Sequence, residues 1–231
     1  MKIGVAITMH SEHNVVIASI INMKRRETDQ YTIALIHSDD GSDTSELEKL
    51  VDHYERLPDL FPLYNRFNFG AHAQSRNYNA AFRWLYYTNI EFDILVAMFG
   101  DTLITDPSNF NRRYDEMKLN GKIAMVSQAI GHWFYSNTDD PTIIGQHGSR
   151  YQDEKITDIM PQLFLLDGKF ARANKLFADI KVTNQFTTEQ CMGDELARTV
   201  GIDFHDKIGR LNKDHPVEAY QYGDGVVLQY K

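Results

Sequence analysis

Residues 92–99 have the sequence FDILVAMF, the most strand-like run in this 231-residue chain. A short apolar run of this kind is typical of a strand that is buried on both faces of a parallel sheet. Residues 3–8 (IGVAIT) and 31–36 (YTIALI) have the same character. The three runs together predict a central sheet whose two faces are covered by other elements.

Helical patterns separate these runs. Val16, Ile20 and Met23 recur at helical spacing before the basic stretch 24–26, which suits a helix C-terminus. Alternating strands and helices predict an α/β fold with a mostly parallel, right-handed central sheet in a single domain. Another helix is expected at 75–87, with Ala80, Ala81, Trp84 and Leu85 on its buried side. The capping-box spacing of 43–46 predicts the start of a further helix, and Asp106-Pro107 the start of one that ends near 119. The remaining expected elements are helices at 169–177 and 189–200 and strands at 60–64, 122–127 and 161–166.

The composition excludes several classes of protein. With 24 Lys and Arg against 32 Asp and Glu, the formal charge is −8, which disfavours general binding to nucleic-acid phosphates. The single cysteine, Cys191, cannot form an internal disulfide. The longest apolar runs are far shorter than the roughly 20 residues that span a bilayer, and residues 3–7 are too short for a signal peptide. We therefore expect a soluble, cytoplasmic protein without a membrane span.

Polar clusters follow the predicted strands where their carboxyl ends would lie. Each cluster alone suits an ordinary turn or helix cap, but open α/β sheets bind ligands at this edge, so together the clusters predict one crevice. Carboxylates beside an arginine suit a nucleoside diphosphate with Mg²⁺ or Mn²⁺. The clusters are Thr8-Met9-His10, SDDGS at 38–42, Asn68-Phe69-Gly70 with Arg76-Asn77 behind it, and Gly100-Asp101-Thr102.

Neither GxxxxGK[ST] nor GxGxxG follows the first strand, so neither a P-loop NTPase nor a standard dinucleotide fold is supported. Residues 38–44 (SDDGSDT) instead resemble the DDGS-x-D signature of inverting, family-2-like glycosyltransferases with the GT-A fold. Asn68-x-Gly70 with Arg76-Asn77 resembles that family's N-x-G…A-R-N segment, and residues 99–107 (FGDTLITDP) are similar to its D-S-D…I-x-x-P metal motif. GDEL at 193–196, with Arg198 and Gly201, is more loosely similar to its E-D-x-x-L-x-x-R…G base segment.

The resemblance implies a nucleotide-sugar-binding half at 1–128 and an acceptor and catalytic-base half at 129–231. Thr8 and Asp39 would contact the nucleotide of the donor, for which a UDP-sugar is the preferred candidate. Asp101 would ligate Mn²⁺ or Mg²⁺ at the diphosphate. Asp194 or Glu195, with Asp194 preferred, would deprotonate the acceptor hydroxyl. The remaining implied site residues are His10, Asp40, Asn68, Arg76 and Gly100 for the nucleotide-sugar and His215, ahead of His205, for the metal.

For several residues, and for the function, the sequence leaves alternatives open. Phe99 stands where the family has the first Asp of its metal motif, so one acidic contact is missing. His132 and Trp133 are either an acceptor platform of stacking rings or the edge of a strand, and residues 220–230 are either a lid or a strand. The acceptor hydroxyl belongs to a glycan, a protein or a nucleic-acid base. The alternative functions are a nucleotide-sugar-binding subunit without turnover and a sugar-nucleotide pyrophosphorylase, whose Gly-rich loop is absent from 9–14.

Overall fold

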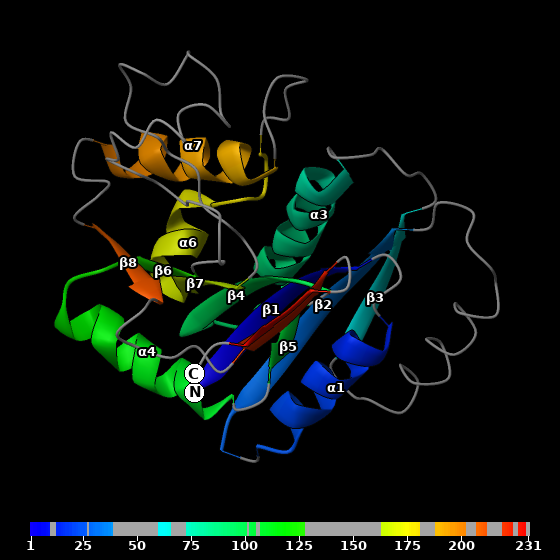
Figure 1. Cartoon of the computed structure of the whole chain (residues 1–231). Helices are drawn as coiled ribbons and strands as arrows, with labels where there is room; N and C mark the ends of the chain where they lie inside the picture. Colours follow the sequence, from blue (N-terminus) through cyan, green and yellow to red (C-terminus); the bar gives the residue numbers. More distant parts are fainter. Residues whose placement is uncertain are drawn as a thin grey trace, which may run out of the picture.

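The computed structural model describes residues 1–9, 13–26, 28–38, 60–65, 73–100, 102–104, 107–127, 163–180, 188–201, 207–211, 219–223 and 226–229. In that part of the chain, seven strands form one sheet with the order β3-β2-β1-β4-β7-β6-β8 (Figure 1). They are β1 (Lys2–Met9), β2 (Gln30–Ser38), β3 (Leu60–Asn65), β4 (Ile94–Phe99), β6 (Ala124–Ser127), β7 (Leu163–Asp167) and β8 (Ile208–Leu211). Every strand predicted from the sequence is present, and β8 is an additional one.

The prediction of a mostly parallel sheet is confirmed. The pairs β1-β2, β1-β4, β2-β3 and β6-β8 are parallel. Only β7 runs against the other strands of this sheet, since it is antiparallel to both β4 and β6. Because β7 and β8 come from the second half of the chain and the other five strands from the first, one sheet joins the two halves.

Helices cover both faces of the sheet and share separate apolar cores with it. In β1, Ile3, Val5 and Ile7 join the core of the first face, whereas Ala6 joins the core of the second, as strand alternation requires. None of the helices in the described part of the chain is long and apolar enough to cross a membrane. The first face is covered by α1 (His13–Lys24) and α4 (Ser108–Leu119), and the second by α3 (Ala73–Tyr87), α6 (Gly168–Asn174) and α7 (Thr188–Val200) (Figure 1).

The buried side of α3 differs by one residue from the prediction. Ala81 and Leu85 are buried and Trp84 is half-buried, as expected, but Ala80 is exposed. Tyr78 and Phe82, four residues apart and each fully buried, complete that side. The aromatic pair fixes the rotation of α3 on the sheet, because two large rings bury far more apolar area than one alanine methyl group.

The ends of α4 lie close to their predicted positions. The helix begins one residue later than predicted, since Pro107 occupies the N-cap and Ser108 is the first helical residue. Asn120 forms the C-cap and Gly121 has a φ of 62°, so the predicted Asn-Gly stop is confirmed. Asp106 and the helix predicted to begin at 43 lie outside the described residues.

A second, three-stranded sheet joins the end of the chain to the segment that follows β4. It has the order β10-β9-β5, with β5 (Thr102–Ile104), β9 (Ala219–Gly223) and β10 (Val226–Gln229). Of the two outcomes for residues 220–230, the structure therefore has the strands. Ser19 of α1 fixes β5, because its hydroxyl donates to the Thr102 carbonyl (3.0 Å) and accepts from the Ile104 N–H (2.9 Å).

Candidate functional site

The carboxyl ends of β1, β2 and β4 meet at one edge of the sheet. Thr8 pairs with Ile36 of β2 on one side and with Phe99 of β4 on the other. The Gly100 N–H donates to the Thr8 carbonyl at 2.8 Å, so these two predicted site residues lie side by side. The sheet therefore brings together the ends of the strands that the polar clusters follow in the sequence.

Several predicted site residues cannot be placed against this edge. Nothing in the described part of the chain supplies three His, Cys, Asp or Glu side chains that could hold a metal ion together. The residues that lie outside the described ones are His10, Asp39, Asp40, Asn68, Asp101, His132, Trp133 and His215.

The Thr8 side chain has an uncommon environment at this edge. It is 4% exposed, and its Oγ1 has no hydrogen-bond partner within the described residues. A buried hydroxyl without a partner costs about 1–3 kcal/mol. Thr8 thus brings an unpaired hydroxyl group to the end of β1.

Phe99 serves the packing of the second core. Its half-buried ring lies 6.1 Å from that of Tyr78, centroid to centroid, and it packs against the core beneath α3. Because the side chain at 99 faces α3, this position contributes no charge to the edge of the sheet. At the position where the sequence resemblance places the first Asp of a metal motif, this chain thus has an aromatic packing contact.

Arg76 lies in the first two turns of α3 and is exposed. Because α3 follows β3 and precedes β4, which is parallel to β1, the helix has to start near the carboxyl edge and return to the amino edge. Arg76 is therefore on the same side of the molecule as Thr8 and Gly100. Its neighbour Asn77 is buried, at 2% exposure.

One face of α3 holds the segment that leads towards α7. Asn79, Arg83 and Tyr86 are spaced by four and three residues and so lie on one side of the helix. Asn79 donates to the Ile180 carbonyl (3.2 Å) and accepts from the Ile180 N–H (2.6 Å). Arg83 donates through Nε to the Ala178 carbonyl, and the Tyr86 hydroxyl donates to that of Leu176 at 2.8 Å.

Replacing Asn79 by Ala is expected to lower the free energy of unfolding by about 1–3 kcal/mol, because it leaves both backbone groups of Ile180 without their partner. Ile180 is 3% exposed, so water replaces those bonds poorly. Urea unfolding measures the loss. Asp179→Ala is the matched control, since the carboxylate paired with Arg83 is 86% exposed and contributes less than about 1 kcal/mol. Equal losses in the two variants would contradict the prediction.

Glu195 of α7 binds the turn that follows α6. Its Oε1 accepts from the Phe177 N–H at 2.9 Å, and Phe177 has a φ of 61°, a backbone that non-glycine residues seldom adopt. The other oxygen, Oε2, is buried and has no hydrogen-bond partner within the described residues. Burial raises the pKa of Glu195, against the opposing effects of the Phe177 N–H and Arg198. This carboxyl group is therefore already used to hold α7 against the second core.

Because the pKa of Glu195 is higher in the folded than in the unfolded chain, its proton favours folding. That contribution is fully present below the ordinary value of 4.5 and is lost as the pH rises through the raised value. A glutamine side chain at this position does not titrate. We therefore expect the stability of the natural protein, relative to Glu195→Gln, to fall in urea titrations as the pH rises above about 4.5. A constant difference, or one that grows with pH, would contradict the raised pKa.

Solved structures share the fold of this chain, whereas comparison by sequence assigns it to no family. No family profile matches the chain, and no curated sequence matches it. A mannosyltransferase from Pyrobaculum calidifontis, solved with GDP-Man and Mn²⁺, matches with a TM-score of 0.56 at 10% identity over 98% of this chain and 56% of that one. TarS 1–349 from S. aureus, solved with UDP, matches with a TM-score of 0.57 at 10% identity over 93% and 59%.

A third solved structure has the same fold. Glucosyl-3-phosphoglycerate synthase from Mycobacterium tuberculosis, in complex with phosphoglyceric acid, matches with a TM-score of 0.51 at 11% identity, covering 90% of this chain and 68% of that one. The chain thus spans little more than half the length of the first two proteins. At these identities the likeness concerns the fold, and it confirms the GT-A architecture that the sequence motifs predicted.

Proposed function

We propose that this protein is a glycosyltransferase that moves a sugar from a nucleotide-diphosphate sugar to an acceptor hydroxyl. The preferred candidate for the donor is a UDP-sugar. The observation that carries the proposal is the carboxyl edge of a GT-A sheet, where Thr8 and Gly100 lie side by side. Solved proteins of this fold are in complex with UDP or GDP-Man. Thr8, Gly100 and Arg76, together with His10, Asp39, Asp40 and Asn68, are the proposed donor contacts, all within the donor half, 1–128.

The proposed reaction is a direct displacement with inversion at the anomeric carbon. A base of α7, in the acceptor half 129–231, takes the proton of the acceptor hydroxyl as its oxygen attacks that carbon. The bond from the anomeric carbon to the phosphate oxygen breaks, and the nucleoside diphosphate leaves with its electron pair. Since Glu195 already binds the Phe177 amide, Asp194 is the preferred base. His132 and Trp133 remain the proposed acceptor contacts.

A divalent metal belongs to the proposal through Asp101 and His215. When bound, Mn²⁺ or Mg²⁺ would offset the charge that develops on the leaving diphosphate. One protein of the same fold was solved with Mn²⁺. In the sequence, Asp101 directly follows Gly100 and precedes β5. The described residues offer no alternative metal cluster.

We expect Asp101→Ala to abolish the gain in nucleotide affinity that Mn²⁺ provides, with a loss of about tenfold or more, while metal-free binding persists. The physical reason is the removal of the one carboxylate that the motif retains after Phe99 replaces its first Asp. Isothermal titration with UDP, with and without Mn²⁺, measures this. If the metal effect survives in Asp101→Ala, another group holds the metal.

A panel of nucleotide-sugars tests the function itself. Thermal shift reports binding, and release of nucleoside diphosphate in the presence of candidate acceptors (a glycan, a protein or a nucleic acid) reports turnover. Lack of binding by every UDP-, GDP- and TDP-sugar at about 1 mM would refute the proposal. Binding without turnover would favour the second candidate, a nucleotide-sugar-binding subunit, which the packing role of Phe99 also favours.

A further inference from the structure

A second site lies at the opposite end of the strands. A pocket of about 860 Å³ opens at the amino edge, where β1, β2 and β4 begin. It falls within the range of about 300–1,000 Å³ that is typical of small-molecule sites. Thr8 comes six positions after Lys2 along β1, so the two sites are about 20 Å apart. The pocket is therefore separate from the proposed donor site.

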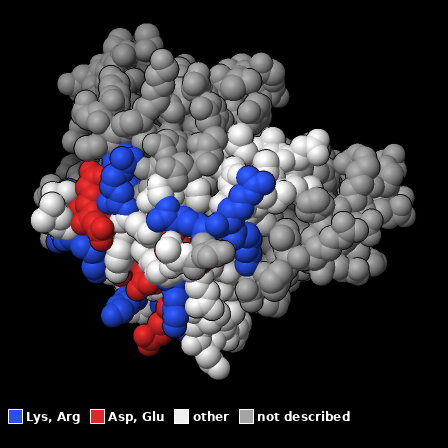
Figure 2. Space-filling model, turned by 90° about the horizontal axis from the view of Figure 1, so that it is seen from below, with Lys and Arg blue, Asp and Glu red and all other residues white. Residues whose placement is uncertain are grey.

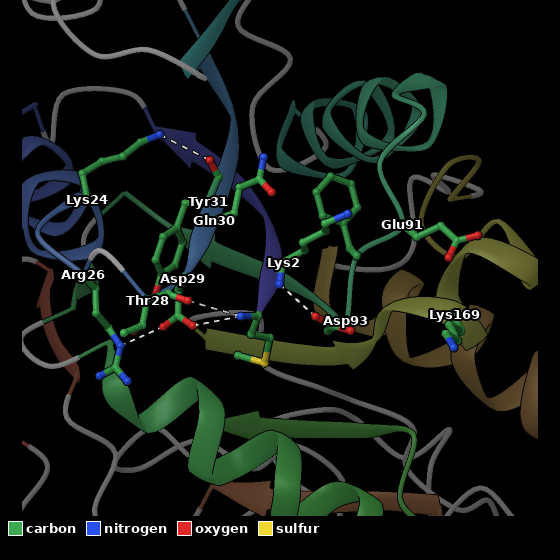
Figure 3. Close-up of a pocket in the computed structure, with 12 residues that line it drawn as sticks. Lys2, Lys24, Arg26, Thr28, Asp29, Gln30, Tyr31, Glu91, Asp93 and Lys169 are labelled. Carbon is green, nitrogen blue, oxygen red and sulfur yellow. Dashed lines mark hydrogen bonds and ion pairs between the residues drawn. The ribbon is translucent and has the colours of Figure 1, made fainter.

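Four cationic side chains from different elements line this pocket. Figure 3 shows Lys24 and Arg26 on one side, Lys169 on the other, and Lys2 between them. The lower face of the molecule, seen in Figure 2, carries Lys and Arg side chains across its middle. The concentration is notable in a chain with a formal charge of −8. Such a pocket attracts an anion against the overall charge of the protein.

Two of the four cations are held in place by the fold. Arg26 binds Asp29 through Nε at 2.7 Å, and the Asp29 side chain is 1% exposed. Asp29 is further neutralised by the Met1 nitrogen at 3.3 Å. Lys24 donates through Nζ to the Tyr31 carbonyl at 3.3 Å. Because these partners offset the charge of the Asp29 carboxylate, it repels an anion in the pocket less.

The other two cations are available to a ligand. The side chains of Lys2 and Lys169 are exposed and form no hydrogen bond or ion pair that involves the described residues. The exposed side chain of Glu91, which lies across from Lys24 in Figure 3, likewise forms no hydrogen bond or ion pair with the described residues. Asp93, the residue before β4, accepts a hydrogen bond from the Lys2 backbone N–H at 2.8 Å. The pocket thus offers free cations and free carboxylate oxygens close together.

We propose that this pocket binds a phosphorylated sugar. The phosphate group would lie against Lys2 and Lys169, because ammonium groups form charge-assisted hydrogen bonds to phosphate oxygens. The sugar hydroxyls would donate to the carboxylates of Glu91 and Asp93, which accept but cannot donate when ionised. A purely anionic ligand would meet repulsion from these acids. A neutral sugar would leave the lysines without a partner.

Titration calorimetry with glucose 6-phosphate, glucose and inorganic phosphate tests this inference. We expect the sugar phosphate to bind the natural protein at least tenfold more tightly than glucose or phosphate. The double variant Lys2→Ala/Lys169→Ala should weaken it by tenfold or more. Glu91→Gln should weaken glucose 6-phosphate severalfold, whereas inorganic phosphate, which the carboxylate repels, should bind no more weakly than before. Lys207→Ala, an exposed lysine that does not line the pocket, is the control and should bind normally.

The outcomes that overturn the inference are distinct. Absence of binding at about 10 mM glucose 6-phosphate would refute the site. Equal affinity for phosphate and glucose 6-phosphate would refute the role of the sugar, and normal binding by the double variant would place the ligand elsewhere. Competition by UDP would assign the ligand to the donor edge and also overturn the inference. A failure of UDP to bind at all would affect only the proposed function, because the amino-edge pocket does not depend on it.

Discussion

Replacing Gly168 by Ala is expected to lower the free energy of unfolding by about 3 kcal/mol or more, enough to unfold much of a marginally stable protein. Gly168 is buried at the start of α6, and a β-carbon there would overlap the carbonyl oxygen of Phe92. The obstacle is backbone and cannot rotate away. Gly168 is also fixed in position, because its N–H donates to the Asp93 carbonyl at 2.9 Å and its neighbour Asp167 caps the helix at Phe170.

Gly4→Ala is the matched control for this steric argument. Its β-carbon would meet the Cδ2 atom of Leu95 at 2.6 Å and the ring of Phe92 at 3.2 Å, both parts of side chains that can shift. We therefore expect a smaller loss, of about 1–2 kcal/mol. Thermal and urea unfolding of the two variants measure the difference. A Gly168→Ala protein as stable as Gly4→Ala would show that α6 does not approach the start of β4 as closely as the structure has it.

The central sheet could be predicted from sequence because its strands are short, continuous apolar runs. Residues 3–8, 31–36 and 94–98 are buried on both faces, so each needs no alternating pattern and stands out from the polar clusters at its end. The same property makes β8 hard to find. Its four residues, IGRL at 208–211, include a glycine and an arginine and form a strand because β6 is there to pair with them.

The candidate site was predictable only in part. Strand ends carry the polar clusters, so the meeting of Thr8 and Gly100 follows from the parallel order of β1 and β4. The bond from the Phe177 amide to Glu195 spans 18 residues and depends on a left-handed turn at a phenylalanine, for which the sequence carries no signal. The packing of Phe99 on Tyr78 likewise depends on the rotation of α3. Contacts of this kind arise from packing between elements.

Replacing Asp194 by Asn is expected to reduce turnover by about 10²–10⁴-fold, the usual contribution of a general base, while the affinity for the nucleotide-sugar stays within about twofold. Positions 194 and 195 lie about 100° apart around α7, so the contact of Glu195 with Phe177 leaves Asp194 on another side of the helix. A base acts on the acceptor hydroxyl and does not touch the nucleotide. The loss should therefore fall on kcat, with donor binding unchanged.

The acidic residues of α7 give this prediction its controls. Glu195→Gln keeps an oxygen for the Phe177 N–H and should retain most of the turnover, whereas Glu189→Gln changes a carboxylate in the first turn of the same helix. Release of nucleoside diphosphate and calorimetric binding are measured for all three variants at equal folded fraction. If Glu195→Gln loses turnover and Asp194→Asn does not, the buried carboxyl is the base and its raised pKa is functional. If only Glu189→Gln loses turnover, the base is Glu189, which lies about one and a half turns before Asp194 in α7.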